Sequence, residues 1–216
     1  METEKTKNNF ESAISLASSR MLSAFGAYSM WKWMNQAINI NNSGGKKEAD
    51  RNVEIFNTYT MVFGQLIKST YKSFVADLSI FFDKNYEDTF TIDNLLVLGK
   101  DRFSPQDIIE LKTKIAEIKK SHGKNISFLN ELRNADVAHQ EMDSKSRHLE
   151  YINIENLFKA AQEILNLISN KYNNSIHWWD HVEKEMGHQM KWLVDNLERG
   201  ESVRLEEIRK EYGVDN

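Results

Sequence analysis

The chain has 216 residues, of which 40% are hydrophobic and 28% charged, a composition typical of a folded globular protein. Acidic residues outnumber basic ones by 32 to 28, which excludes a uniformly basic surface, so any contact with nucleic acid must come from a local group of cations. The absence of cysteine excludes disulfides, thiolate catalysis and cysteine-ligated zinc.

Nothing in the sequence predicts export or membrane insertion. The first nine residues are polar and lack the apolar centre of a signal peptide. A run of about 18 apolar residues, the length that a membrane-spanning helix requires, does not occur. We therefore expect a cytoplasmic protein. One proline and nine glycines are few helix breakers, which predicts long helices with short connections.

The first part of the chain predicts two long helices. In residues 9–40, apolar side chains such as Phe10 and Ala17 recur at steps of three and four, which indicates an amphipathic helix. Residues 41–47 read Asn-Asn-Ser-Gly-Gly-Lys-Lys and predict a loop. The same periodicity predicts a second helix over residues 49–83.

Shorter helices are predicted in the middle of the chain. Residues 92–98 form one that ends at Gly99. The run Ser104-Pro105-Gln106-Asp107 predicts a helix start, because serine caps, proline fits the first position and an acid favours the first turn. This helix runs to residue 121 and stops at His122-Gly123. The next spans residues 125–142.

The C-terminal part predicts three more helices. Asn153 is placed to cap a helix over residues 154–170, and Asn173-Asn174-Ser175 interrupts the chain after it. A helix over residues 176–197 ends at Arg199-Gly200, and residues 203–212 form a short charged helix.

Strand signals are absent throughout, so the sequence predicts an all-α, up-and-down helical bundle. We expect one domain over residues 1–216. Its core would span residues 50–170, with an N-terminal helix in 1–45 and a helical extension in 174–216.

Three polar residues on the 125–142 helix form a candidate catalytic site. Arg133 carries a planar, permanently charged guanidinium that matches a phosphate in geometry, and Asn134 can orient that phosphate. An imidazole such as that of His139 gives and accepts protons near neutral pH. Together they are a minimal set for cleaving a phosphodiester without a metal or cofactor.

The spacing of these residues raises a geometric question. On an ideal helix the side chains of Arg133 and His139 point about 120° apart. A kink in the helix, the long reach of Arg133, or a second subunit would each bring both groups to one phosphate. A two-fold axis near the site would also supply two imidazoles, one as base and one as acid.

The pattern Leu132-Arg133-Asn134 followed by Ala138-His139 resembles the Arg-Asn-x4-His form of the HEPN superfamily. Together with the helix reading Phe-Val-Ala-Asp-Leu-Ser-Ile-Phe-Phe-Asp at residues 74–83, it resembles the abortive-infection, AbiU-like branch, over residues 59–167.

This resemblance implies a metal-independent endoribonuclease. The implied enzyme is a homodimer whose two motifs meet near the two-fold axis, with RNA as substrate and 2′,3′-cyclic phosphate and 5′-hydroxyl ends as products. The implied catalytic residues are Arg133, Asn134 and His139. The implied setting is phage defence or a toxin–antitoxin pair with a cognate antitoxin.

A non-catalytic reading of the same residues stays open: a HEPN-like module that binds nucleotides or proteins. A lone histidine on an apolar stripe is more often a core or interface residue, and Arg133 can pair with Glu131 or Asp136. Asp136 can instead orient the imidazole. Asp77 lies in an apolar run and needs a partner, which either Arg133 or a local hydrogen bond can supply.

A histidine group offers a second candidate site. His177, His181 and His188 would share one face of the predicted 176–197 helix with Glu185, as in a surface metal site. We favour no metal site, because Trp178 and Trp179 dominate this segment and no second ligand cluster is recognisable. The single Glu-x-x-His pair also disfavours a ferritin-like oxidoreductase, since a di-iron bundle needs two. Binding of a metal by the three histidines stays open.

The richest basic stretch directly precedes the 125–142 helix. Such a run can follow an RNA backbone electrostatically, or it can be an ordinary solvated helix face. It consists of Lys112, Lys114, Lys119, Lys120 and Lys124.

Overall fold

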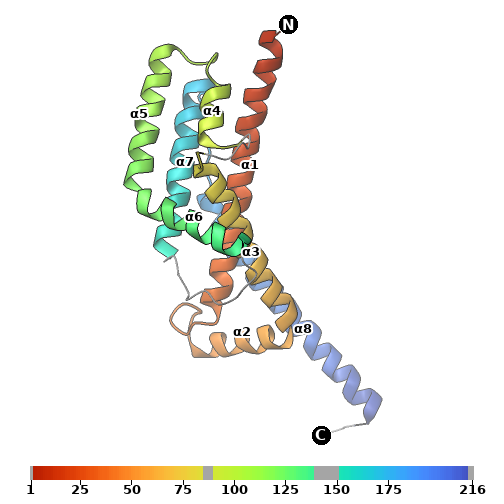
Figure 1. The fold of residues 1–216 in the computed structure, drawn as a ribbon. Coiled ribbons are helices and arrows are strands. Elements are labelled where there is room, and N and C mark those ends of the chain that lie inside the picture. The colour runs from red at the N-terminus through yellow and green to blue at the C-terminus, as the bar shows by residue number, and fades with distance from the viewer. Residues whose placement is uncertain (1, 85–89, 139–150, 214–216) are drawn as a thin grey trace. The chain divides into compact units, whose positions relative to one another are not determined.

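In the computed structural model, the regular structure is helical wherever the chain is described (Figure 1). The structure describes residues 2–84, 90–138 and 151–213, with side chains from residue 9 onward except those of 135–138 and 151. This part of the chain confirms the predicted all-α bundle and contains no strand. Its helices are α1 (Glu2–Ala37), α2 (Lys46–Thr58), α3 (Thr60–Phe82), α4 (Ile92–Leu98), α5 (Pro105–Ser121), α6 (Gly123–Ala138), α7 (Tyr151–Asn173) and α8 (Asp180–Tyr212).

The chain packs into two compact units. The first comprises Met1–Ala27 and Tyr71–Asp180, and the second comprises Tyr28–Thr70 and His181–Asn216. Both α1 and α3 contribute residues to each unit. The expected single domain over residues 1–216 stays a prediction.

In the first unit, α1 enters the core through small and aromatic side chains. Ala17 and Met21 are fully buried. The ring of Phe10 packs edge-on against Phe103 and Tyr172, with centroid distances of 5.6 and 5.0 Å. Edge-to-face packing is a favourable geometry for aromatic pairs, so the three- and four-residue periodicity of α1 marks its buried face.

Helix α7 supplies a continuous apolar face to the same core, and both α5 and α6 pack against it. The two helices that carry the basic stretch and the Arg133 motif are therefore supported by one scaffold. Its fully buried side chains are those of Leu157, Ala161, Ile164, Leu165 and Ile168.

The single helix predicted over residues 49–83 is wrong, because the chain leaves the helical path at Tyr59. This residue has φ −112° and ψ 40°, and it separates α2 from α3. The hydroxyls of Thr58 and Thr60, on either side, donate to backbone carbonyls at 3.0 and 2.6 Å. Such side-chain bonds compete with helical hydrogen bonding, and they are hard to foresee without a glycine or proline.

The break at Tyr59 lets α2 and the first part of α3 share one core in the second unit. The rings of Phe56 and Phe63 stack across it with centroids 4.1 Å apart. Trp33 packs near Phe56, with ring centroids 6.5 Å apart. The buried members of this core are Met34, Ile55, Phe63, Met190 and Val194.

The predicted end of a helix at Arg199-Gly200 is also wrong, because α8 continues to Tyr212. A side chain at Gly200 would contact nothing within 4 Å, so the glycine lies on an open face. A glycine inside a helix costs about 1 kcal/mol relative to alanine and need not end it. One turn on, Arg204 bonds to Glu201 at 2.5 Å.

Several local signals are confirmed. Ser104 and Asp107 form a complete capping box at the start of α5. Gly99 is the C-cap of α4. Asn174, just beyond α7, has a positive φ of 57°, a conformation that asparagine tolerates better than most residues. Asn153, by contrast, does not cap α7, which begins two residues earlier, at Tyr151.

No described helix combines the length and the apolar content needed to cross a bilayer.

Candidate functional site

The predicted motif lies toward the C-terminal end of α6. Leu129 and Leu132 turn into the core, with exposed fractions of 0% and 8%. Arg133 and Asn134 follow directly, Arg133 half-buried and Asn134 exposed. The buried leucines anchor the helix and thereby present these two polar side chains at the edge of the first unit.

Arg133 is held by a carboxylate from another helix end. Its Nη1 donates to Oδ2 of Asp83 at 2.8 Å. Asp83 follows the last residue of α3, Phe82, which is buried. The side chains of Arg133 and Asp83 are only 19% and 13% exposed. A pair so shielded is screened less by solvent and salt than a surface pair.

Asn134 lies beside the same guanidinium. Its Oδ1 is 3.4 Å from both Nε and Nη2 of Arg133. These contacts are long, so the hydrogen bond to Asp83 is the main one that positions the Arg133 guanidinium. The structure thus brings Arg133 and Asn134 together, as the sequence predicts.

The ion pair has two chemical consequences. A guanidinium already fixed in orientation loses little side-chain entropy when it binds a phosphate. The carboxylate of Asp83 also offsets part of the positive charge that a phosphate would use. Asp83 therefore positions Arg133 and competes with its ligand.

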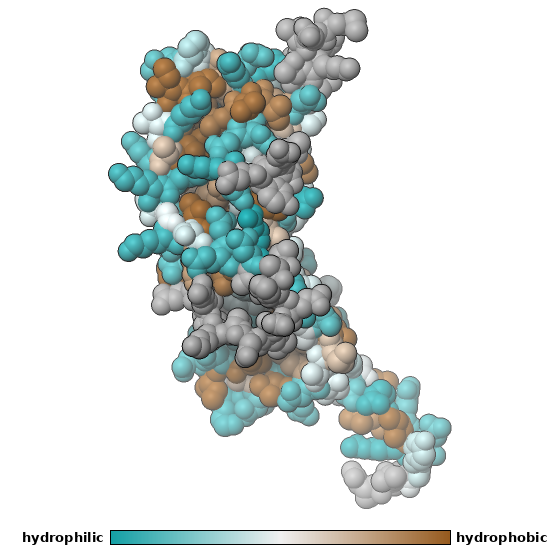
Figure 2. Space-filling model, viewed as in Figure 1, coloured by the Kyte–Doolittle hydropathy of each residue, from teal (hydrophilic) through white to brown (hydrophobic). Residues whose placement is uncertain are grey.

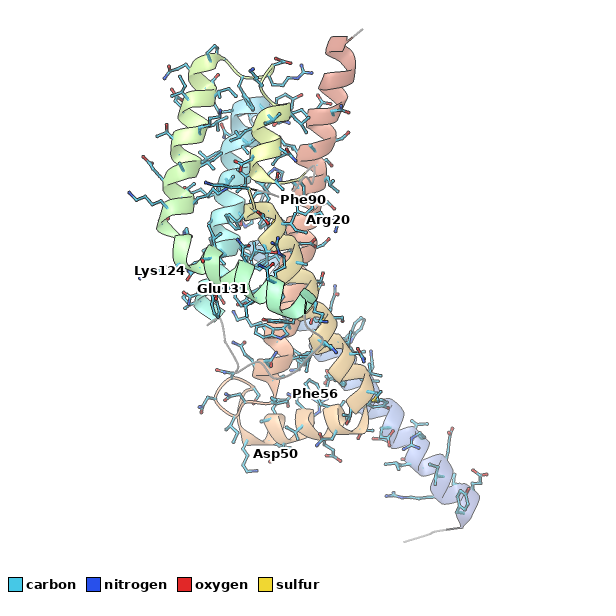
Figure 3. All side chains as sticks on the ribbon, viewed as in Figure 1. Arg20, Asp50, Phe56, Phe90, Lys124 and Glu131 are labelled. Atoms are coloured by element: carbon cyan, nitrogen blue, oxygen red, sulfur yellow. The ribbon has the colours of Figure 1, made fainter. Side chains whose placement is uncertain are left out.

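Asp83 is the site residue that sequence reasoning missed. The available signal was a carboxylate directly after the buried pair Phe81-Phe82. The alternative carboxylate, Asp77, pairs with Arg20 of α1 instead, at 3.3 Å. The guanidinium carbon of Arg20 also lies 5.6 Å from the ring centre of Phe90, and Figure 3 shows the two residues side by side.

The predicted proton-transfer residue, His139, lies outside the described residues. The same holds for the side chain of Asp136. The angle between Arg133 and His139, and the role of Asp136, therefore stay predictions.

The histidine group is not arranged as predicted. Helix α8 begins at Asp180, so His177 precedes it and does not share a helix face with His181 and His188. Its ring lies 2.8 Å from Ser18 Oγ through Nδ1 and 2.8 Å from Ser169 Oγ through Nε2. Within the described ranges, no three or more His, Cys, Asp or Glu side chains are grouped to hold a metal ion.

Further bonds make His177 a junction between α1, α7 and the segment before α8. Its backbone N–H donates to Asn166 Oδ1 at 2.6 Å, and its carbonyl accepts from Gln162 Nε2 at 3.0 Å. Burial lowers the pKa of the His177 ring, which favours the neutral form. A neutral ring that donates through one nitrogen and accepts through the other suits two serine hydroxyls.

The basic stretch is mostly a solvated face. Lys112, Lys114, Lys120 and Lys124 are exposed, whereas Lys119 is turned inward. Hydrophilic side chains predominate over α5 and α6 on the face in view in Figure 2. Lys114 also lines a groove of about 530 Å³ together with Lys159 of α7.

A comparison with known protein families confirms the resemblance to the AbiU-like branch of the HEPN superfamily. A model of the HEPN family described as AbiU2 matches residues 25–191, which include Arg133, Asn134 and His139. No curated protein and no solved structure matches the chain.

Proposed function

This chain belongs to the HEPN family AbiU2, and from that premise we propose that it is a metal-independent endoribonuclease acting in abortive infection. The observation that carries the proposal is the fixed guanidinium of Arg133 beside the exposed Asn134 at the edge of the first unit. It supplies the phosphate-binding half of a ribonuclease site.

In the proposed reaction, RNA provides its own nucleophile. The ribose 2′-oxygen attacks the adjacent phosphorus, the bond from phosphorus to the 5′-oxygen breaks, and a 2′,3′-cyclic phosphate and a 5′-hydroxyl result. One imidazole takes the proton from the 2′-hydroxyl, and another group returns a proton to the 5′-oxygen. Arg133 binds the phosphate and stabilises the charge that develops on it, and Asn134 orients it.

His139 is the proposed proton-transfer residue. A single imidazole serves poorly as base and acid at once, so the proposal includes a homodimer in which two copies of His139 approach one phosphate. Phage defence or a toxin–antitoxin pair, with a cognate antitoxin restraining the enzyme, is the setting that fits such an activity.

The test is incubation of purified protein with a mixed RNA in EDTA, followed by analysis of the RNA ends. We expect cleavage to 2′,3′-cyclic phosphate ends by the wild type, and no cleavage by Arg133→Ala/His139→Ala. Arg20→Ala is the matched control, because it removes an arginine that pairs with Asp77 of α3 and not with Asp83, and it should cleave as the wild type does. Equal cleavage by the double variant would contradict the proposal.

A second function is favoured by the Arg133–Asp83 ion pair itself. Since the guanidinium already has a counter-charge, the site can be a module that binds RNA or nucleotides without cleaving them. The same assay separates the two functions. RNA that stays intact but is retained by the wild type, with weaker retention by Arg133→Ala, indicates the non-catalytic module.

A further inference from the structure

Lys119 is a buried cation whose charge the protein does not satisfy well. It lies in the last turn of α5, and its side chain is only 15% exposed. Its Nζ atom is buried and has no hydrogen-bond partner among the described residues. The carboxylate of Asp93 is 3.9 Å away, which is beyond hydrogen-bonding distance. Burial lowers the pKa of Lys119, and Asp93 opposes that shift.

Such an arrangement is unfavourable for folding. A buried ammonium group that lacks hydrogen bonds loses its hydration without replacement. The same unit satisfies another lysine fully: Lys171 bonds to Asp107 at 2.5 Å and to Glu110 at 3.1 Å. The neighbouring Lys120 is exposed and solvated. The inward position of Lys119 therefore calls for a reason other than stability.

A second unsatisfied atom lies on α6. Oδ1 of Asn130 is buried and has no hydrogen-bond partner among the described residues. Asn130 precedes Arg133 and Asn134 by three and four residues, a spacing that places the three side chains on one side of the helix. The first unit thus contains an unsatisfied donor and an unsatisfied acceptor, the two kinds of group that a phosphate and a ribose hydroxyl would satisfy.

Lys119 and Arg133 are connected through Asp83. The carboxylate of Asp83 bonds to Arg133, and its negative charge also acts on Lys119, as does the positive charge of Lys84. The carboxylate of Asp83, directly after α3, therefore links the two cations electrostatically, although its effect on Lys119 is weaker than that of Asp93.

We propose that Lys119 is a second phosphate-binding cation of the Arg133 site, engaging the backbone of a bound RNA strand. Because Nζ is buried in the protein without RNA, the proposal includes an outward rotation of the Lys119 side chain on binding, after which the phosphate supplies the anionic oxygen that Nζ lacks. This inference rests on RNA being the ligand of the proposed function, and it concerns binding, so it does not require that the strand be cut.

The test measures RNA affinity and fold stability in the same variants. All proteins carry His139→Ala, so that the strand stays intact, and a short fluorescent single-stranded RNA is titrated at several salt concentrations. Lys119→Met removes the charge at similar volume. Lys120→Met is the matched control, because it makes the same chemical change at the adjacent, exposed position.

We expect Lys119→Met to weaken RNA binding about fivefold to tenfold and to reduce the slope of log affinity against log salt by about 0.7. Its midpoint of thermal unfolding should stay the same or rise, because a poorly paired buried charge has been removed. Lys120→Met should change the affinity less than about twofold.

A purely structural role for Lys119 gives the opposite result, a lower unfolding midpoint with unchanged RNA affinity, and would overturn the proposal. If Lys119→Met does not fold, Lys119→Gln, which keeps a polar end, must show the same loss of affinity.

The outcome also separates this inference from the proposed function. RNA binding that depends on Lys119, without cleavage by the wild type, supports the inference and refutes the ribonuclease. Cleavage by the wild type with unchanged RNA affinity in Lys119→Met refutes the inference alone. A wild type that neither binds nor cleaves RNA refutes both.

Discussion

The two ends of α5 treat charged side chains in opposite ways. At the N-terminal end, Ser104 and Asp107 exchange hydrogen bonds, and Lys171 of α7 bonds to Asp107 and Glu110. These bonds raise the pKa of Lys171 and lower the pKa values of both carboxyls, so all three groups are held in their charged forms. Every charge in this group has a partner.

At the C-terminal end of α5, the charged side chains are not all paired. Lys119 is buried without a hydrogen bond, and the carboxylate of the mostly shielded Arg133–Asp83 pair acts on its charge. We interpret this contrast as two different roles for the two ends of α5. The satisfied end fixes the position of α5 on α7, and the unsatisfied end keeps positive charge available for a ligand.

In the second unit, by contrast, one arginine is paired with three carboxylates. Arg51 bonds to Glu48, Asp195 and Glu198 at 2.9, 2.5 and 2.7 Å and so joins α2 to α8. The hydrogen bonds to Glu198 and Asp195 raise the pKa of Arg51. This arginine serves the fold, and its three carboxylates leave it poorly suited to bind a phosphate.

The largest expected effect is that of Asp83→Ala. It removes the counter-charge of a mostly buried arginine and should lower the free energy of unfolding by about 3 kcal/mol. Chemical denaturation measures the loss. Asp83→Asn, which keeps a hydrogen-bond acceptor for Arg133, should lose less and retain more RNA cleavage, because Asp83 positions the guanidinium.

A double-mutant cycle with Arg133→Ala isolates the pair. We expect the double variant to be less destabilised than the sum of the two single variants. Strict additivity would mean that the two side chains do not interact, and the positioning role of Asp83 would then be wrong.

An intermediate effect is expected at the N-terminal end of α5, where the charged side chains are paired. Ser104→Ala removes the N-cap of α5 and should lower the free energy of unfolding by about 1 kcal/mol. RNA affinity should not change, because the cap stabilises the helix end remote from Lys119. A loss of RNA affinity in Ser104→Ala at unchanged stability would break the contrast between the two ends.

The smallest effect is expected at His177. Burial lowers its pKa in the folded protein, so the folded state binds a proton less readily than the unfolded chain. Its contribution to stability is therefore complete above pH 6.5, the ordinary pKa of histidine, and is lost as the pH falls below that value. The effect is small because the ring is only half-buried.

Thermal unfolding between pH 8 and pH 5 tests this expectation. In His177→Asn, the unfolding midpoint should fall less steeply toward low pH than in the wild type. The exposed control His181→Asn should follow the wild type. An unchanged decline in His177→Asn would show that the ring does not contribute to the pH dependence.

Local rules of helix formation account for most of the fold that could be predicted. Apolar periodicity, the Ser104-Pro105-Gln106-Asp107 start, Gly99 and Asn174 act within a few residues and are visible in the sequence. The main errors arose at two positions, Tyr59 and Gly200, where the usual helix-breaking residues were a poor guide. Tyr59 ends α2 where Phe56 and Phe63 stack, and Gly200 lies on an open face where it does not interrupt α8.

The site was predictable in part for the same reason. Arg133 and Asn134 are neighbours in the sequence, and their proximity needed no long-range information. The pairing of Arg133 with Asp83 spans 50 residues. The burial of Lys119, beside the exposed Lys120, depends on the packing around it. Neither follows from spacing on one helix.

The most direct test of the contrast between the two ends of α5 is one RNA titration of the wild type, Ser104→Ala and Lys119→Met, with the unfolding midpoint of each protein recorded beside it. The account predicts opposite changes: Ser104→Ala is less stable and binds RNA as the wild type does, whereas Lys119→Met is at least as stable and binds RNA more weakly. Lys119→Met that binds RNA normally and unfolds more easily would contradict it.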